Sequence, residues 1–107
     1  MPGTTVPTVL IIEEDQQLRR LLGTILGGAG YRVLEARSHD RALELLASGA
    51  DSVDVVIHDS PLSLERIGTG CKVLLLSCYA AASPGNGMLR KPFKPAALIE
   101  AVRKLLR

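Results

Sequence analysis

The chain has 107 residues, of which 47% are apolar and 22% charged, and its formal net charge is +2. This length suits one domain with a single core, which one Phe, two Tyr and no Trp make aliphatic. So small a charge gives no electrostatic case for nucleic-acid binding, and no apolar run approaches the roughly 20 residues of a membrane span. We therefore expect a soluble, cytoplasmic domain with neither nucleic acid nor membrane as a partner.

The ends of the chain and its cysteines support this expectation. Residues 1–8 are rich in Pro, Gly and Thr and lack the basic and apolar stretches of a signal peptide. We predict a flexible leader over residues 1–8 and one domain over residues 9–107. Cys71 and Cys78 flank a predicted strand, which would hold them more than about 20 Å apart, too far for a disulfide. Free thiols suit a reducing compartment.

Two periodicities alternate along the chain. Short runs rich in β-branched residues have the length of strands, and longer segments repeat apolar residues at helical spacing. The predicted strands are Val9–Ile12, Tyr31–Ala36, Val53–Asp59, Lys72–Ser77 and Met88–Lys91. The predicted helices are Gln16–Leu26, a second that begins at residues 38–40 and closes at Gly49, and a third that begins at Pro95. Asp15 is placed to cap the first helix and the glycines of residues 27–30 to end it.

The connections in the second half of the chain are short. Strands that alternate with helices indicate a parallel sheet with helices on both faces. A crossover between parallel strands, with its helix, needs roughly 10–12 residues. Residues 60–71 can therefore hold one or two helical turns, and residues 78–87 a single turn at best. The sequence predicts an α/β domain whose second half is shortened.

Polar residues follow the predicted strands at the points where each ends. They are Glu13, Glu14 and Asp15 after the first strand, Asp59 after the third, Ser77 after the fourth and Lys91 after the fifth. Because parallel strands end at one edge of a sheet, we expect these side chains to meet there. Converging carboxylates repel each other unless a cation intervenes, and an oxygen-only set suits Mg²⁺. A lysine and a hydroxyl nearby would complete a pocket for a phosphoryl group, which an aspartate can accept as an acyl phosphate.

This ordered set of motifs resembles the receiver domains of response regulators, above all those of hybrid histidine kinases. The residues that carry the resemblance are Val9–Asp15 with Leu18-Arg19, the strand end at Asp59, Val73–Ser77, and Arg90-Lys91-Pro92-Phe93. The resemblance covers about Val9 to Leu106. It implies a flavodoxin-like three-layer sandwich with a five-stranded parallel sheet in the order 2-1-3-4-5. It also implies a two-component phosphorelay, with a histidine kinase or phosphotransfer protein as the partner.

The resemblance assigns roles by motif position. Asp59 matches the phosphoacceptor, and Glu13 and Glu14 match the acidic pair that binds Mg²⁺ together with Asp59. Ser77 matches the switch hydroxyl, and Lys91 matches the lysine that contacts the phosphoryl group. Such a domain is a signalling module rather than an enzyme, because its chemistry is limited to its own phosphorylation and dephosphorylation.

The sequence departs from the receiver pattern at several points. Receivers usually carry at least one Asp in the acidic pair, whereas Glu13 and Glu14 are longer and displace their carboxylates from the usual octahedral geometry. Pro61 follows Asp59 more closely than the usual proline does, and Cys78 stands where a smaller residue is usual. The third and fourth crossover helices are predicted to be shortened or missing.

These departures leave an alternative interpretation open. A degenerate receiver would act as a phosphorylation-independent interaction or dimerisation module. Shortened helices should uncover Val55, Ile57 and Leu74 or their neighbours, and a large apolar patch normally has a partner. This interpretation predicts a homodimer or a contact with an adjoining domain.

Two other kinds of site are disfavoured. A nucleotide or flavin site needs glycines and bare N–H groups in the first βα turn, where this chain has Glu13-Glu14-Asp15. A zinc site of His58, Asp59 and Cys78 lacks the usual ligand spacing. Strand alternation also turns His58 to the face opposite Asp59, so we expect a packed or partly exposed histidine rather than a catalytic one.

Overall fold

The structure is a computed structural model that describes residues 6–47, 53–58, 72–77, 87–90 and 93–106. Its elements are β1 (Thr8–Ile12), α1 (Gln16–Gly28), β2 (Arg32–Ala36), α2 (His39–Ala47), β3 (Val55–His58), β4 (Lys72–Ser77), β5 (Gly87–Arg90) and α4 (Pro95–Leu106). The predicted shortening of the third and fourth crossover helices falls on residues 59–71 and 78–86, which lie outside the described residues. In the part of the chain that the structure describes, no helix is both long and apolar enough to span a bilayer.

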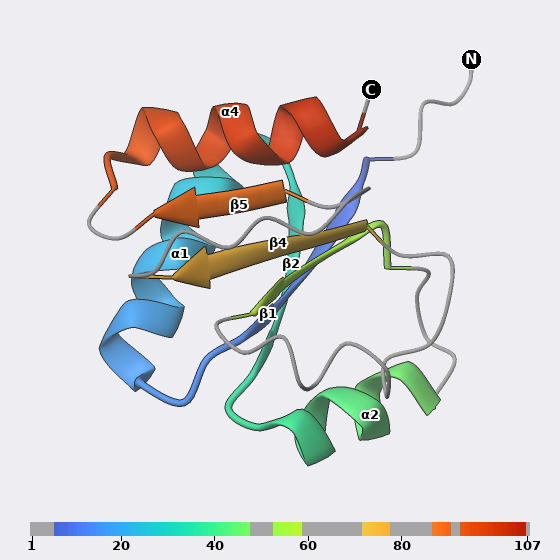
Figure 1. Cartoon of the computed structure of the whole chain (residues 1–107). Helices are drawn as coiled ribbons and strands as arrows, with labels where there is room; N and C mark the ends of the chain where they lie inside the picture. The colour runs from blue at the N-terminus through green and yellow to red at the C-terminus, as the bar shows by residue number, and fades with distance from the viewer. Residues whose placement is uncertain (1–5, 48–52, 59–71, 78–86, 91–92, 107) are drawn as a thin grey trace.

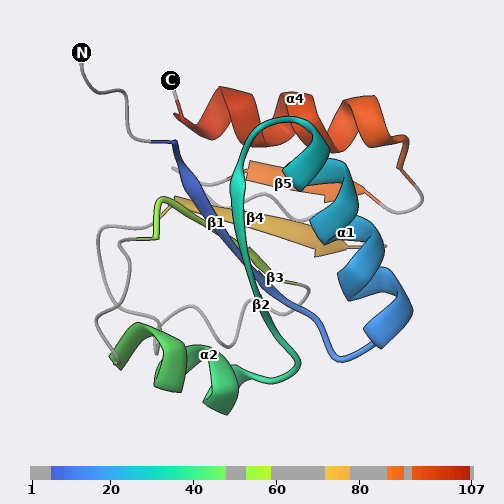
Figure 2. The same cartoon turned by 180° about the vertical axis from the view of Figure 1, so that it is seen from behind.

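The five strands form one sheet in the order β2-β1-β3-β4-β5, and every neighbouring pair is parallel. Helices α1 and α4 pack on one face of this sheet, and α2 packs on the other (Figures 1 and 2). The α/β class, the three layers and the strand order 2-1-3-4-5 are therefore as predicted.

The inner strand β1, which lies between β2 and β3, is apolar without a break for a structural reason. Val9 and Ile11 point into a core shared with α1 and α4. Leu10 and Ile12 point into a second core shared with α2. A strand that is covered on both faces needs apolar residues at every position, and all four side chains are at most 4% exposed.

The expected exposure of an apolar sheet face is wrong. Val55, Ile57 and Leu74 are at most 1% exposed, and their neighbours Val56 and Val73 are buried as well. Alternation along β3 and β4 turns the first three side chains toward α1 and α4, which run for several turns and cover that face. The predicted shortening of the third and fourth crossover helices therefore does not decide whether Val55, Ile57 and Leu74 are covered.

Helix α1 begins where the sequence predicts and ends later. Asp15 Oδ1 accepts hydrogen bonds from the amides of Gln17 and Leu18, at 2.9 and 3.3 Å, which confirms it as the N-cap. The predicted end at Leu26 is wrong, because the helix continues through Gly28. The chain turns away at Gly30, whose φ of +98° suits a residue without a side chain.

Candidate functional site

The carboxyl ends of the strands lie along one edge of the sheet (Figure 1). In the strand registers, Ile11 lies opposite Ile57, His58 opposite Leu75, and Ser77 opposite Arg90. Strands β1, β2 and β3 thus end at one level, and β4 and β5 end two residues beyond it on the same edge. Asp59 and Lys91 directly follow described strands but lie outside the described residues. The backbone of Ser77 closes β4, and its side chain is likewise not described.

Glu13 is the predicted site residue that the structure describes most fully. It is only 7% exposed although it carries a carboxylate. Its amide donates to the Ala36 carbonyl at 3.0 Å, and its Oε2 accepts from the Asp15 amide at 3.0 Å. Its main-chain carbonyl accepts from Arg19 Nη1 at 2.9 Å. Among the described residues Glu13 Oε1 has no hydrogen bond or ion pair.

Glu14 lies in a different environment from Glu13. It is exposed, and it lines a small hollow of about 250 Å³ on the α2 side of the sheet. Ile12, His39 and His58 line the same hollow. The two glutamates are therefore not an equivalent pair, because one is buried and fixed by its neighbours while the other is exposed to solvent.

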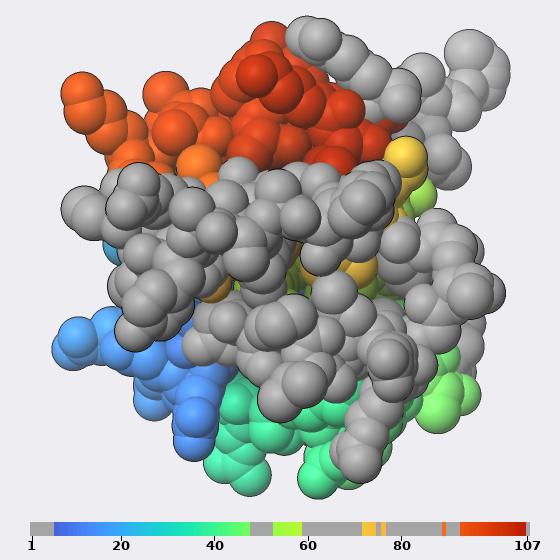
Figure 3. Space-filling view, in the orientation of Figure 1, coloured from blue at the N-terminus to red at the C-terminus, as the bar shows by residue number. Residues whose placement is uncertain are grey.

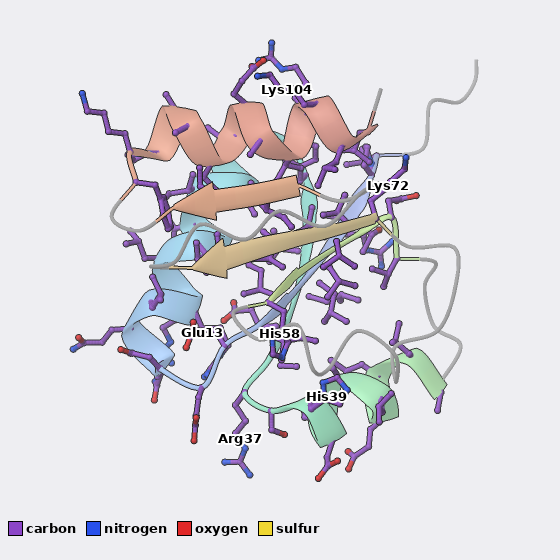
Figure 4. The ribbon with its side chains drawn as sticks, viewed as in Figure 1. Glu13, Arg37, His39, His58, Lys72 and Lys104 are labelled. Carbon is purple, nitrogen blue, oxygen red and sulfur yellow. The ribbon has the colours of Figure 1, made fainter. Side chains whose placement is uncertain are left out.

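The prediction that His58 is a packed histidine is confirmed. The residue is 7% exposed, and its ring meets that of His39 edge to face, with 5.8 Å between centroids and 76° between planes (Figure 4). The pair joins the first residue of α2 to the last residue of β3. Both ring nitrogens of His39 are buried and have no hydrogen-bond partner among the residues that the structure describes. Within the described ranges no three His, Cys, Asp or Glu side chains could together hold a metal ion, and the predicted magnesium set includes Asp59, which lies outside them.

A larger hollow, of about 800 Å³, lies beside this edge and was not expected from the sequence. It is lined by Arg19, Arg20, Glu35, Arg37, Ser38, Asp40, Arg41 and Glu44. These residues come from α1, the end of β2 and the start of α2, whose blue and teal-green surfaces meet along the lower edge of Figure 3. Arg19 pairs with Glu35 at 3.4 Å, and Arg41 pairs with Glu44 at 2.7 Å. The sequence gives no sign of the first pair, because it joins side chains of a helix and a strand whose relative orientation is set by the fold.

Comparison with known proteins gives matches of two kinds. No family model matches the chain. A curated relative, described as an uncharacterized transcriptional regulatory protein YrkP of Bacillus subtilis (strain 168), is 43% identical over 51 residues. This match covers 48% of the chain and 21% of the relative, so the similar segment is about a fifth of that protein.

Solved structures match over nearly the whole chain. The receiver domain of the hybrid histidine kinase CckA is 28% identical, with a TM-score of 0.79, over 94% of this chain and 99% of that one. A LuxR family DNA-binding response regulator from Silicibacter pomeroyi is 29% identical, with a TM-score of 0.80, over 94% and 92%. A response regulator receiver protein from Sinorhizobium medicae WSM419 is 29% identical, with a TM-score of 0.78, over 94% of each chain. The chain has the fold of a receiver domain.

The predicted resemblance to receiver domains is thereby confirmed, and so is the flavodoxin-like architecture. The similar structures are receiver domains of response regulators, which are signalling modules of two-component systems rather than enzymes of metabolism. In this receiver fold the described edge holds a fixed, buried Glu13 next to the strand end that leads into Asp59.

Proposed function

We propose that the chain is a receiver domain that accepts a phosphoryl group on Asp59 from the phosphohistidine of a histidine kinase or phosphotransfer protein. The observation that carries the proposal is the buried carboxylate of Glu13, which keeps one oxygen without a partner among the described residues. A buried carboxylate is costly unless a cation or hydrogen-bond donors compensate it. The free oxygen at the strand edge therefore supports a cation site at the place where the motif order puts the phosphoacceptor.

The donor set that we propose for Mg²⁺ is Glu13, Glu14 and Asp59. Only oxygen atoms are involved, which suits a hard cation, and Oε1 of Glu13, which has no partner among the described residues, fits such a ligand role. When bound, the ion would offset the negative charge that gathers as a phosphoryl group approaches these carboxylates. The unequal environments of Glu13 and Glu14 support an arrangement in which Glu13 is the fixed ligand and Glu14 the adjustable one.

The proposed transfer needs three groups of this chain. A carboxylate oxygen of Asp59 attacks phosphorus, an O–P bond forms, and the N–P bond of the donor breaks with its electron pair going to the imidazole. The ammonium of Lys91 pairs with the phosphoryl oxygens, and the Ser77 hydroxyl donates a hydrogen bond to one of them. The phosphorylated edge then changes which protein surfaces the domain contacts, which would be its output.

A small phosphodonor tests this function. Acetyl phosphate with Mg²⁺ should add the mass of one phosphoryl group to the intact chain, and Asp59→Asn should abolish the gain. Asp54→Asn is the matched control, because Asp54 precedes the same strand at its opposite end, where its Oδ2 accepts from the Thr8 amide at 2.8 Å. No mass gain in the wild-type chain, or an equal gain in Asp59→Asn, would contradict the proposal.

The alternative, a phosphorylation-independent dimerisation module, has less support. It was argued from an uncovered apolar face, and Val55, Ile57 and Leu74 are buried. No observation among the described residues favours a homodimer. Sedimentation at high micromolar concentration, with and without acetyl phosphate, would separate the two interpretations. A phosphorylation-independent module should form the same dimer in both conditions.

A further inference from the structure

One arginine joins three elements around the acidic turn. Arg19, on the first turns of α1, donates from Nη1 to the main-chain carbonyl of Glu13 at 2.9 Å. Its Nε lies 3.4 Å from Oε1 of Glu35, which is on β2. The Arg19 side chain is only 16% exposed, so its guanidinium is held between the turn and the neighbouring strand. A planar guanidinium can donate hydrogen bonds to two acceptors in fixed directions.

The position of Glu35 depends in turn on a glycine. A Cβ added at Gly23, one helical turn after Arg19, would meet Glu35 Oε2 at 3.2 Å. Glycine inside a helix costs roughly 1 kcal/mol relative to alanine. Here it leaves room for the Glu35 carboxylate to lie against α1 within reach of Arg19.

The contact with Glu13 matters because the carbonyl belongs to the peptide that leads into Glu14. The Glu13 amide is held by the Ala36 carbonyl, and its Oε2 by the Asp15 amide. Arg19 adds the one contact that fixes the carbonyl, and so the direction in which the chain leaves β1. Both glutamates of the proposed magnesium set therefore depend on it for their orientation.

We propose that Arg19 is a positioning residue for the acidic turn of residues 13–15, held by Glu35, and that it sets the affinity of Glu13 and Glu14 for Mg²⁺. This inference rests on the proposed function, because it takes Mg²⁺ as the ligand. The role is indirect: Arg19 touches the main chain of a ligand residue and not the ion. Groups that orient metal ligands in this way typically change metal affinity by about 10–100-fold when they are replaced.

The direction of the effect separates positioning from simple electrostatics. A guanidinium that acted only through its charge would repel a nearby cation, so a neutral residue would tighten Mg²⁺ binding. A positioning arginine has the opposite signature, and its loss weakens binding. Lysine keeps the charge, so electrostatics alone predicts no change in Mg²⁺ affinity for Arg19→Lys. Its compact ammonium cannot span both the Glu13 carbonyl and Glu35, so a positioning role predicts weaker binding.

Calorimetric titration with Mg²⁺ tests the inference, supported by Mn²⁺ resonance because the chain has no Trp to report on binding. We expect Arg19→Lys and Arg19→Gln each to weaken Mg²⁺ affinity about tenfold while unfolding in EDTA stays cooperative. Arg41→Lys is the matched control, since it alters an exposed arginine whose ion pair within the described residues is with Glu44. Unchanged or tighter binding by the two Arg19 variants would overturn the inference.

A second measurement does not depend on the metal. The Asp15 amide donates to Glu13 Oε2, so in metal-free protein its hydrogen exchange reports the order of the turn. Arg19→Lys should speed this exchange several-fold, whereas Arg41→Lys should not, and unchanged exchange in Arg19→Lys would overturn the positioning role. A wild-type chain that binds no Mg²⁺ would instead contradict the proposed function, and the exchange result would still decide the role of Arg19.

Discussion

Carboxylates at the two ends of the sheet have different tasks, which their hydrogen bonds distinguish. Asp15 accepts from two amides and caps a helix, and Asp54 accepts from the Thr8 amide where β1 begins. Glu13 accepts from one amide with one oxygen and leaves the other free among the described residues. What sets Glu13 apart is its burial, since it is 7% exposed whereas Asp15 and Asp54 are exposed. A cation beside a buried carboxylate offsets the cost of burying its charge, which an exposed carboxylate does not incur.

The capping role of Asp15 gives a prediction for stability. Replacing Asp15 by Ala removes the acceptor for the amides of Gln17 and Leu18, and the free energy of unfolding should fall by about 1 kcal/mol. Urea unfolding measures this change. Gln17→Ala is the control, because the amide of Gln17 and not its side chain makes the capping contact. Equal stability of Asp15→Ala and the wild-type chain would show that solvent replaces the cap at no cost.

At the scale of the elements, the sequence predicts where elements lie better than where they end. Unbroken β-branched runs and helical spacing are local signals, and all strands and helices in the described ranges were expected. The start of β3 was predicted at Val53 and lies at Val55, directly after Asp54, whose carboxylate accepts from the Thr8 amide of a distant segment. The late end of α1 has a local cause, since Ala29 still donates to the Ile25 carbonyl four residues before it.

For the candidate site too, the sequence predicts the place of the residues better than their contacts. The order of Glu13, Asp59, Ser77 and Lys91 along the chain was enough to predict one shared strand edge, since the positions of strand ends follow from topology. The contact of Arg19 with the main-chain carbonyl of Glu13 could not be predicted, because it depends on where the Arg19 side chain is held. Arg19 is held there by Glu35 on another strand, and one sequence gives no sign of that pairing.

Replacing the two glycines near the end of α1, Gly27 and Gly30, by alanine should change the stability of the fold in opposite directions. Nothing lies within 4 Å of a Cβ built at Gly27, which is inside the helix, so Gly27→Ala should stabilise the fold by about 0.5–1 kcal/mol. Gly30 has a φ of +98°, so Gly30→Ala should destabilise it by about 1 kcal/mol, although the space there is open as well. Thermal unfolding of the two variants checks both signs. If both variants stabilised the fold, backbone conformation would not be what ends the helix.

At the scale of the whole molecule, the two faces of the sheet are unequally covered. One core combines α1 and α4 with the sheet and buries Leu22, Leu26, Leu98 and Val102 completely. The other has a single described helix, α2, in which Ala42 is the buried residue. Because stability within a domain follows buried apolar contact, the α2 face should open more readily than the rest.

Amide hydrogen exchange measures this difference between the faces. Amides of α2 should exchange through a local opening that needs little denaturant, whereas those of α1 and α4 should exchange only near global unfolding. Leu22→Ala should lower protection across the sheet, since it leaves a cavity in the larger core at a cost of roughly 2–5 kcal/mol, while Leu45→Ala beside the smaller core should affect mainly α2. Equal protection in α1 and α2 would mean that the histidine contact between His39 and His58 ties α2 to β3 as firmly as the leucines hold α1.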